Sequence, residues 1–381
     1  MRITIIGWYG TETIGDRAIL AGLISFFSKS FKSFEIKLGS LYPFFSERTL
    51  NEDCAFYKEI TGKGYDIKIF NSKKPKELVN AIKNSDLIVM GGGPLMDLNE
   101  LFMVEYAFKK AKKLGVKTAL LGCGVGPLFN KKYRKSVLEI SLHSDIHILR
   151  DSQSKNSLSV LYKEFKKTLN LDLIHTSFDP AVECVLHHNN NDARDYIAIN
   201  LRAFPAEYNK NRGGSRGIDN ELKQFVASVS RQFSEQEIKL VPMHYFHVGS
   251  DDRVFLNSIA LDLKLDNITV QNKNLTLKET IDVYKHAYFN IGMRFHAVVL
   301  QTIVSGKNFV LDYTEPGKGK INSFLKDIDK NEFYKNRYLS MQEDKVSTDI
   351  INHMDEVFRP EEAGIRSVLN IYTELLTGLS K

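Results

Sequence analysis

The hydrophobic positions along the first half of this chain follow two alternating patterns. Short, nearly continuous apolar runs are typical of buried strands and occur at residues 2–7, 67–70, 87–90, 118–122 and 146–149. Longer stretches with apolar residues three or four positions apart predict helices at residues 17–27, 75–84, 100–114 and 131–143. Strands that alternate with helices in this way predict a doubly wound parallel sheet.

The alternation resumes after a polar, turn-forming segment at 186–192, which we interpret as a linker. Further strands are predicted at residues 196–201, 238–242, 288–291 and 309–311, and further helices at 219–233, 276–285 and 297–304. A chain of 381 residues exceeds the usual size of a single core. We therefore expect domains at 1–186 and 193–350, followed by a helical segment at 351–381. Two Rossmann-like domains facing across a cleft would form a glycosyltransferase-B-like architecture.

Composition narrows the class of protein without naming a function. The cysteines Cys54, Cys123 and Cys184 lack metal-binding spacing and fit a reducing compartment. The N-terminus lacks the apolar core of a signal peptide, and no apolar run has membrane-spanning length, so we expect a cytoplasmic protein. The net charge of +6 is modest and has no aromatic-interleaved basic motif, so nucleic acid is not an expected partner. Peripheral association with the inner membrane face stays open.

Arg294 and His296 are separated by one residue and lie between the end of a predicted strand and the start of a predicted helix. Parallel sheets bind ligands at the carboxyl ends of their strands, and a helix start attracts anions. A guanidinium can grip a carboxylate or phosphate, and an imidazole can exchange a proton near neutral pH. The pair indicates a small acidic substrate. The alternative is that Arg294 pairs with a nearby acid while His296 caps the helix.

Glycines at strand ends indicate places where the backbone could approach a ligand. Gly91, Gly92 and Gly93 follow one strand, with Asp97 close behind, although a tight turn alone would explain them. Gly124 belongs to a second cluster that lacks the full dinucleotide fingerprint, so we expect no nicotinamide cofactor.

Other polar groups lie at predicted strand ends or helix starts: Asp16, Arg150, Arg202, His244, Lys318 and Lys320. Asp16 could cap the first helix or bind a sugar hydroxyl. Asp151 and Ser152 look like capping residues, which leaves Arg150 as a second candidate anion ligand. Lysines in a Gly-Lys-Gly-Lys loop are usually solvated. No group of side chains has the spacing of a metal site.

These motifs occur in the order Gly91-Gly92-Gly93-Pro94, Gly122-Cys123-Gly124-Val125-Gly126-Pro127, Arg150-Asp151, Asp179-Pro180, Met293-Arg294-Phe295-His296-Ala297 and Lys320. In order and spacing they resemble the polysaccharide pyruvyl transferase family over roughly residues 3–325, and the Met-Arg-x-His-Ala element is the most specific. The resemblance implies two Rossmann-like domains and transfer of pyruvate from phosphoenolpyruvate to two sugar hydroxyls as a cyclic ketal.

The resemblance also implies a phosphoenolpyruvate site formed by Arg150, His296 and Lys320. The loop after Tyr313 is longer than the family's Asp-Pro-Lys, so Lys318 is a rival to Lys320. The N-terminal loop carries Thr13 and Arg17 where the family favours Asn and Glu, which points to an unusual acceptor.

We expect His296 to act as general acid and base, Arg150 and Arg294 to hold the anion, and Lys320 to neutralise departing phosphate. Arg202, His244, Lys318, Asp16, Asp97 and the strand-end glycines are further candidates for substrate binding. This chemistry requires phosphoenolpyruvate as co-substrate and neither a metal nor another cofactor.

The expected setting is cell-surface polysaccharide or exopolysaccharide synthesis. The N-terminal domain would bind the sugar or oligosaccharide acceptor, lipid-linked or free, and the C-terminal domain would bind phosphoenolpyruvate. The alternatives are a nucleotide-sugar-dependent glycosyltransferase of the same architecture and a non-catalytic phosphosugar-binding protein.

Overall fold

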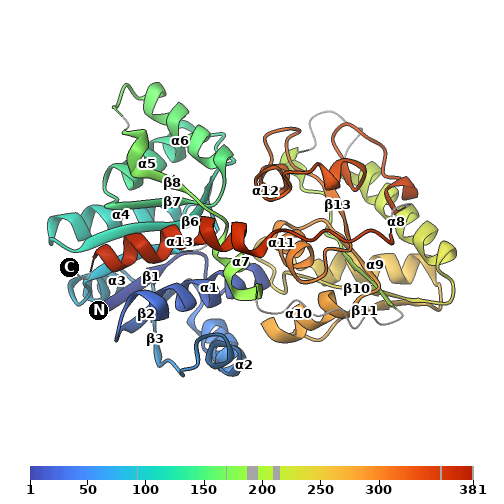
Figure 1. Cartoon of the computed structure of the whole chain (residues 1–381), viewed down its shortest axis with the longest axis horizontal. Helices are drawn as coiled ribbons and strands as arrows, with labels where there is room; N and C mark the ends of the chain where they lie inside the picture. The colour runs from blue at the N-terminus through green and yellow to red at the C-terminus, as the bar shows by residue number, and fades with distance from the viewer. Residues whose placement is uncertain (92, 169, 187–195, 209–214, 352–353, 380–381) are drawn as a thin grey trace. The chain divides into compact units, whose positions relative to one another are not determined.

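The computed structural model describes the chain apart from residues 92, 169, 187–195, 209–214, 352–353 and 380–381 (Figure 1). The chain divides into two compact units. Unit 1 comprises Met1–Cys184 with Glu362–Lys381, and unit 2 comprises Val185–Glu361. Gly92 and all but the first residue of the predicted linker at 186–192 lie outside the described residues.

Unit 1 contains a parallel sheet with the strand order β3-β2-β1-β4-β6-β7-β8. The strands are β1 (Arg2–Ile6), β2 (Glu35–Ser40), β3 (Ile67–Asn71), β4 (Leu87–Gly91), β6 (Lys117–Val125), β7 (Ile146–Leu149) and β8 (Ile174–Thr176), while the short β5 (Pro94–Leu95) pairs with β6. The order reverses between β1 and β4, so their carboxyl ends flank the position where such sheets bind ligands.

The helices of unit 1 are α1 (Ile14–Ser30), α2 (Pro43–Thr61), α3 (Pro75–Lys83), α4 (Leu101–Lys113), α5 (Lys131–Leu142), α6 (Ser152–Glu164), α7 (Pro180–Val185) and α13 (Glu362–Gly378), with a 3₁₀ turn, η1 (Leu171–Leu173). Pro43 and Pro75 occupy first-turn positions that need no N–H donor. Asp151 accepts a hydrogen bond from the Ser154 N–H and caps α6, as predicted.

The C-terminal helix α13 packs on α1 within unit 1 (Figure 1). The rings of Phe26 and Tyr372 stack with centroids 4.2 Å apart. The Tyr372 hydroxyl donates a 2.7 Å hydrogen bond to the Phe178 carbonyl. The end of the chain therefore contributes to the core of the unit in which the chain begins.

Unit 2 contains a parallel sheet with the order β11-β10-β9-β12-β13-β14. The strands are β9 (Tyr196–Asn200), β10 (Glu237–Leu240), β11 (Ile268–Val270), β12 (Phe289–Gly292), β13 (Asn308–Asp312) and β14 (Tyr338–Ser340). The order reverses between β9 and β12, which places a second switch point in the chain.

The helices of unit 2 are α8 (Ser215–Gln232), α9 (Asp252–Leu263), α10 (Leu277–His286), α11 (Phe295–Val304) and α12 (Lys320–Ile328), with 3₁₀ turns η2 (Ala206–Tyr208), η3 (Phe333–Asn336) and η4 (Thr348–Ile351). Thr276 and Glu279 form a capping box at the start of α10. The two parallel sheets confirm the predicted fold class of two Rossmann-like α/β units.

Candidate functional site

The candidate residues of unit 2 gather at the carboxyl edge of its sheet. Arg202 follows β9, His244 follows β10, Arg294 follows β12, and Lys320 follows the loop after β13. His296 lies in the first turn of α11, which begins at Phe295, two residues earlier than predicted. Since the strands are parallel, residues from distant parts of the sequence meet at one edge.

Arg294 forms a buried ion pair with Asp252, the first residue of α9. Its Nε and Nη2 atoms lie 2.7–2.9 Å and 2.5 Å from the carboxylate oxygens, and the Asp252 side chain is completely buried. Burial opposes the guanidinium charge, but Asp252 outweighs it and raises the pKa of Arg294. Arg294 thus forms the ion pair with a nearby acid that the sequence analysis gave as an alternative to anion binding. Its side chain keeps 14% exposure, which leaves part of the guanidinium accessible.

His244 is a buried imidazole beside the same arginine. Burial, together with the positive charges of Arg294 and Arg202, lowers the pKa of His244 to about 4, so the ring is neutral near pH 7. Gly249 packs against the ring with φ of +90°, and a Cβ there would lie 3.0 Å from Cε1. The backbone N–H groups of Met243 and His244 donate to Asp252, so one carboxylate positions both the arginine and the histidine backbone.

Tyr313 is a site residue that the sequence patterns did not single out as functional. It directly follows β13 and is 4% exposed. The Arg202 guanidinium carbon lies 5.7 Å and the Lys320 ammonium 6.0 Å from its ring centroid. Burial acts to raise the pKa of Tyr313, but the charges of Lys320, Arg202 and Arg294 together lower it. Its place after a strand was the only signal in the sequence.

The two candidate lysines differ in their surroundings. The Lys318 side chain is 66% exposed and pairs with Glu315 at 3.3 Å. Lys320 begins α12, and its ammonium lies 5.9 Å from the Phe295 ring as well as near Tyr313. Geometry therefore places Lys320, rather than Lys318, in the cationic cluster, which we define as Arg202, Arg294 and Lys320.

Helix starts add to the positive potential of the cationic cluster. Within the described chain, neither α11 nor α12 has a side-chain cap on its N-terminus. Their first N–H groups carry partial positive charge and can bind an anion. The Nε2 atom of His296 is buried in the first turn of α11, and its ring lies 5.0 Å from that of Phe295. The cluster and these helix starts suit a small anion beside an imidazole.

Arg150 lies in unit 1, buried at the end of β7. Its Nη1 is 3.6 Å from Asp179 and its Nε is 3.4 Å from Asp151. Its guanidinium lies against the backbone of Gly124, where a Cβ would come within 2.4 Å of Nη2. Gly124 therefore makes room for the arginine. Arg150 and His296 belong to different units.

The other glycine candidates in unit 1 have packing roles. A Cβ on Gly91 would approach a Leu23 methyl at 2.4 Å, and one on Gly93, where φ is +71°, would approach the Trp8 ring at 2.6 Å. Asp97 accepts hydrogen bonds from the backbone N–H groups of Phe129 and Asn130 and from the Asn130 side chain, at 2.6–3.2 Å. Asp97 thus fixes the loop that precedes α5.

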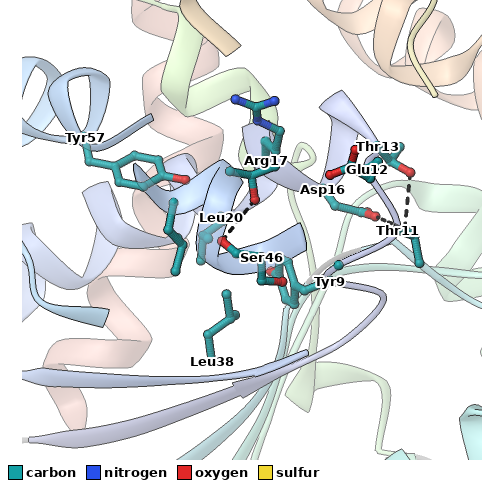
Figure 2. A pocket seen from close by; sticks show the side chains of 13 residues that line it. Tyr9, Thr11, Glu12, Thr13, Asp16, Arg17, Leu20, Leu38, Ser46 and Tyr57 are labelled. Carbon is teal, nitrogen blue, oxygen red and sulfur yellow. Dashed lines mark hydrogen bonds between the residues drawn. The ribbon is translucent and has the colours of Figure 1, made fainter. Parts of the chain in front are cut away.

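A hollow of about 20 Å³ is lined by the loop after β1 and by residues of α1, β2 and α2 (Figure 2). Dashed lines in Figure 2 join Thr11 to Thr13 and to Asp16, at 3.3 and 3.4 Å. Asp16 is not the N-cap: the cap position is Thr13, and Asp16 is the third residue of α1, so the capping interpretation was wrong. Desolvation, with a contribution from Asp179, raises the pKa of Asp16 to about 7.

Arg17, which replaces the family's acidic residue, is balanced by acids on α2. It contacts Asp53 at 2.6 and 2.7 Å and Glu52 at 3.2 Å. Arg48 in turn grips Glu12, a non-glycine residue with a φ of +60°. This network fixes the loop after β1 in an unfavourable backbone conformation, which is typical of functional loops.

The fold and the cationic cluster define a Rossmann-like α/β protein with a candidate anion site. The sequence matches the polysaccharide pyruvyl transferase family over residues 14–315, and the chain belongs to that family. The matched region contains Arg150, Arg294 and His296 and ends before Lys318 and Lys320. No curated protein sequence matches the chain.

Solved structures of low sequence identity share the fold. The UDP-GlcNAc 2-epimerase of Neisseria meningitidis, bound to UDP-GlcNAc, has a TM-score of 0.53 and 12% identity over 100% of both chains. The MnaA–UDP structure of S. aureus has a TM-score of 0.51 and 14% identity, over 98% of this chain and 97% of that one. The epimerase of Methanocaldococcus jannaschii, with UDP-GlcNAc and UDP, has a TM-score of 0.50 and 15% identity, over 90% and 97%.

Two further findings concern membranes and metals. Within the described residues, no helix combines the length and apolar character that crossing a bilayer requires. The same residues contain no group of three or more His, Cys, Asp or Glu side chains suited to hold a metal ion.

Proposed function

We propose that the protein transfers pyruvate from phosphoenolpyruvate to two hydroxyls of a sugar as a cyclic ketal, in the synthesis of a cell-surface polysaccharide. The observation that carries this proposal is the cationic cluster at the switch point of unit 2, beside His296 and the starts of α11 and α12. Phosphoenolpyruvate carries a phosphate and a carboxylate, so it matches a site with several cations. Membership of the family supports the same donor.

The proposed reaction has a balanced course. A proton adds to the methylene carbon, one sugar hydroxyl attacks the adjacent carbon, and the carbon–oxygen bond to phosphate breaks. The second hydroxyl then closes the ketal. Of the two hydroxyl protons, one replaces the proton given to the methylene carbon and the other leaves with phosphate. His296 moves protons, Arg294 and Lys320 hold the anionic oxygens, and Arg150 is a further anion ligand in unit 1.

We place acceptor recognition in unit 1. The loop that leads into α1 carries the hydroxyls of Thr11 and Thr13 and the carboxyl of Asp16, which suit hydrogen bonds to the hydroxyl groups of a sugar. The hollow among them has room for about one water molecule, so the sugar would lie against the loop and not inside the hollow. The Arg17 and Glu12 ion pairs hold this loop in one conformation. The scheme requires phosphoenolpyruvate as its only co-substrate, and the acceptor can be a free or a lipid-linked sugar.

The test is phosphate release from phosphoenolpyruvate by the purified full chain, with a panel of hexosamine and galactose acceptors. We expect acceptor-dependent release, and we expect His296→Ala to lose at least ~10²-fold in rate with an unchanged melting temperature. His286→Ala, at the last turn of α10, is the matched control. Normal turnover by His296→Ala would refute its catalytic role, and failure of every acceptor would refute the proposed reaction.

A nucleotide-sugar glycosyltransferase is the second candidate, because several cations at the carboxyl edge of a parallel sheet also suit a diphosphate. Its phosphate-binding groups could be the same cationic cluster. Thermal stabilisation by a nucleotide-sugar, with phosphoenolpyruvate inert, would favour this candidate. A non-catalytic phosphosugar-binding protein would instead tolerate loss of His296 but not of Arg294.

A further inference from the structure

Tyr313 has a buried side chain whose hydroxyl has no protein partner among the described residues. Its carbonyl oxygen accepts a 3.0 Å hydrogen bond from Gln342, and its ring meets that of Tyr208 edge-on at 5.5 Å. The ring is thus fixed on two sides, while none of the described groups forms a hydrogen bond with the hydroxyl. The hydroxyl is therefore available to a ligand that binds beside the three cations of the cationic cluster.

Two other tyrosines of unit 2 differ from Tyr313 because their hydroxyls have hydrogen-bond partners within the protein. The Tyr334 hydroxyl donates to Asn308 at 2.6 Å, and the Tyr338 hydroxyl donates to Asp312 at 2.9 Å. Burial raises the pKa of both phenols. Tyr313 is as buried as Tyr334, yet its pKa is lowered because cations from separate elements surround it. The environment of Tyr313 is therefore built for negative charge.

The charged groups around Tyr313 come from separate elements of unit 2. Arg202 follows β9, Arg294 follows β12, and Lys320 begins α12. Asp312, the preceding residue, is the acid on the same strand, and it is occupied by hydrogen bonds from Thr314 and Tyr338. The nearby positive charge thus exceeds the negative charge.

We infer that Tyr313 contacts the substrate: its hydroxyl donates a hydrogen bond to an oxygen of the anion held by Arg202, Arg294 and Lys320. This inference rests on the proposed function, in which that anion is the phosphate or carboxylate of phosphoenolpyruvate. The phenol adds an uncharged hydrogen-bond donor to the charged donors of the two arginines and the lysine. Once ionised, it would lose its proton and repel the anion, so binding weakens as pH rises through the pKa of Tyr313.

The first experiment compares the full chain with Tyr313→Phe, which keeps the ring and removes only the hydroxyl. Binding of inorganic phosphate and of phosphoenolpyruvate is measured by calorimetry. We expect affinity to fall on the order of 10-fold or more for both ligands, the usual effect of one hydrogen bond to a charged group. KM for phosphoenolpyruvate should rise by a similar factor.

Tyr196→Phe is the matched control. Tyr196 is also a buried tyrosine of unit 2, and its hydroxyl donates to the Val283 carbonyl at the opposite, amino end of β9. Its loss should leave both affinities unchanged. Wild-type affinity and KM in Tyr313→Phe would overturn the inference while leaving the pyruvyl transferase proposal intact. A phosphate-binding defect in Tyr313→Phe, with a wild-type chain that never turns over phosphoenolpyruvate, would refute the proposed reaction instead.

A second measurement uses the unmodified chain. Alkaline titration followed by tyrosinate absorbance should reveal a phenol that ionises earlier than an ordinary tyrosine and is missing in Tyr313→Phe. Saturating phosphate should move this transition to higher pH, because the bound anion favours the protonated phenol. A transition that phosphate leaves unchanged would overturn the contact.

Discussion

At the residue scale, Asp252 organises the candidate anion site without facing solvent. Its carboxylate pairs with the Arg294 guanidinium and accepts the backbone N–H groups of Met243 and His244. A guanidinium fixed in this way keeps a defined orientation toward a ligand, whereas a free arginine side chain would lose conformational entropy on binding. Asp252 is therefore a positioning residue for the proposed reaction.

We predict that Asp252→Asn destabilises unit 2 by about 3–5 kcal/mol, the usual cost of removing one charge of a buried ion pair and leaving the other without a partner. Urea unfolding followed in unit 2 measures this loss. Asp262→Asn, at the other end of α9, is the control, because the Asp262 side chain is 56% exposed in its pair with Lys223. That variant should change the free energy of unfolding by about 1 kcal/mol or less. Equal effects of the two variants would contradict the role of Asp252.

Asp16 gives a prediction with a definite pH dependence. Its folded-state pKa of about 7 lies above the ordinary value, so the folded protein retains a proton that the unfolded chain has lost. Stability from this group is complete below about pH 4 and is lost as pH rises through 7. Asp16→Asn cannot ionise, so its melting temperature should exceed that of the wild type at pH 8 and approach it at pH 4.

The control for this prediction is Asp172→Asn, an exposed acid in unit 1. The melting temperature of Asp172→Asn should differ from that of the wild type by the same amount at pH 4 and at pH 8. If the melting temperature of Asp16→Asn parallels that of the wild type from pH 4 to pH 8, the pKa of Asp16 is not raised in the folded protein.

At the scale of elements, the ends of β6 and β7 form one unit of structure. The Arg150 side chain lies across the Gly124 backbone and reaches Asp179, which directly precedes α7. A glycine at this end of β6 leaves room for the guanidinium, because a Cβ there would come within 2.4 Å of Nη2 and the arginine would have to move. This is a packing requirement and not a conformational one.

We predict that Gly124→Ala displaces the Arg150 guanidinium, costs about 1–3 kcal/mol of stability by overpacking, and lowers turnover. Thermal unfolding and phosphate release measure the two effects. Gly378→Ala, on α13 of the same unit, is the control because a Cβ there would meet nothing within 4 Å. Full activity and stability in Gly124→Ala would show that Arg150 can lie elsewhere.

At the scale of the whole molecule, Asp16 in unit 1 and His244 in unit 2 make opposite contributions to the pH dependence of stability. Asp16 in unit 1 favours the folded state at acidic pH, as argued above. His244 in unit 2 has its pKa lowered to about 4, so the unfolded chain binds a proton near pH 6.5 that the folded unit refuses. Stability from His244 is present above pH 6.5 and is lost as pH falls through 4.

We therefore predict that acidification from pH 7 to pH 4.5 lowers the stability of unit 2 relative to unit 1. Hydrogen exchange, resolved by peptide and corrected for the chemical effect of pH, measures each unit separately. His244→Gln should remove most of the change in unit 2. Protection factors that fall equally in both units and are insensitive to His244→Gln would contradict this account.

Parts of the fold were predictable from the sequence because they depend on local patterns of apolar residues. Parallel strands are buried on both faces, so β4 and β6 appear as apolar runs. The edge strand β3 is only partly buried but still has apolar residues, whereas β2 begins with Glu35 and α2 is largely polar, and neither element was predicted. Their formation depends on neighbours: β2 pairs with β1 and β3 on its two sides.

The sequence by itself determined the alternating α/β plan, the two parallel sheets and the strand-end positions of Arg294, His296 and Arg150, because apolar periodicity and strand–helix boundaries are local properties. Only the tertiary structure placed Lys320 beside Tyr313 and left Lys318 exposed, paired Arg294 with Asp252, and surrounded Tyr313 with cations. These contacts join residues far apart in the chain, and parallel pairing of strands brings them to one edge. Charge and burial at that edge are properties of the folded molecule alone.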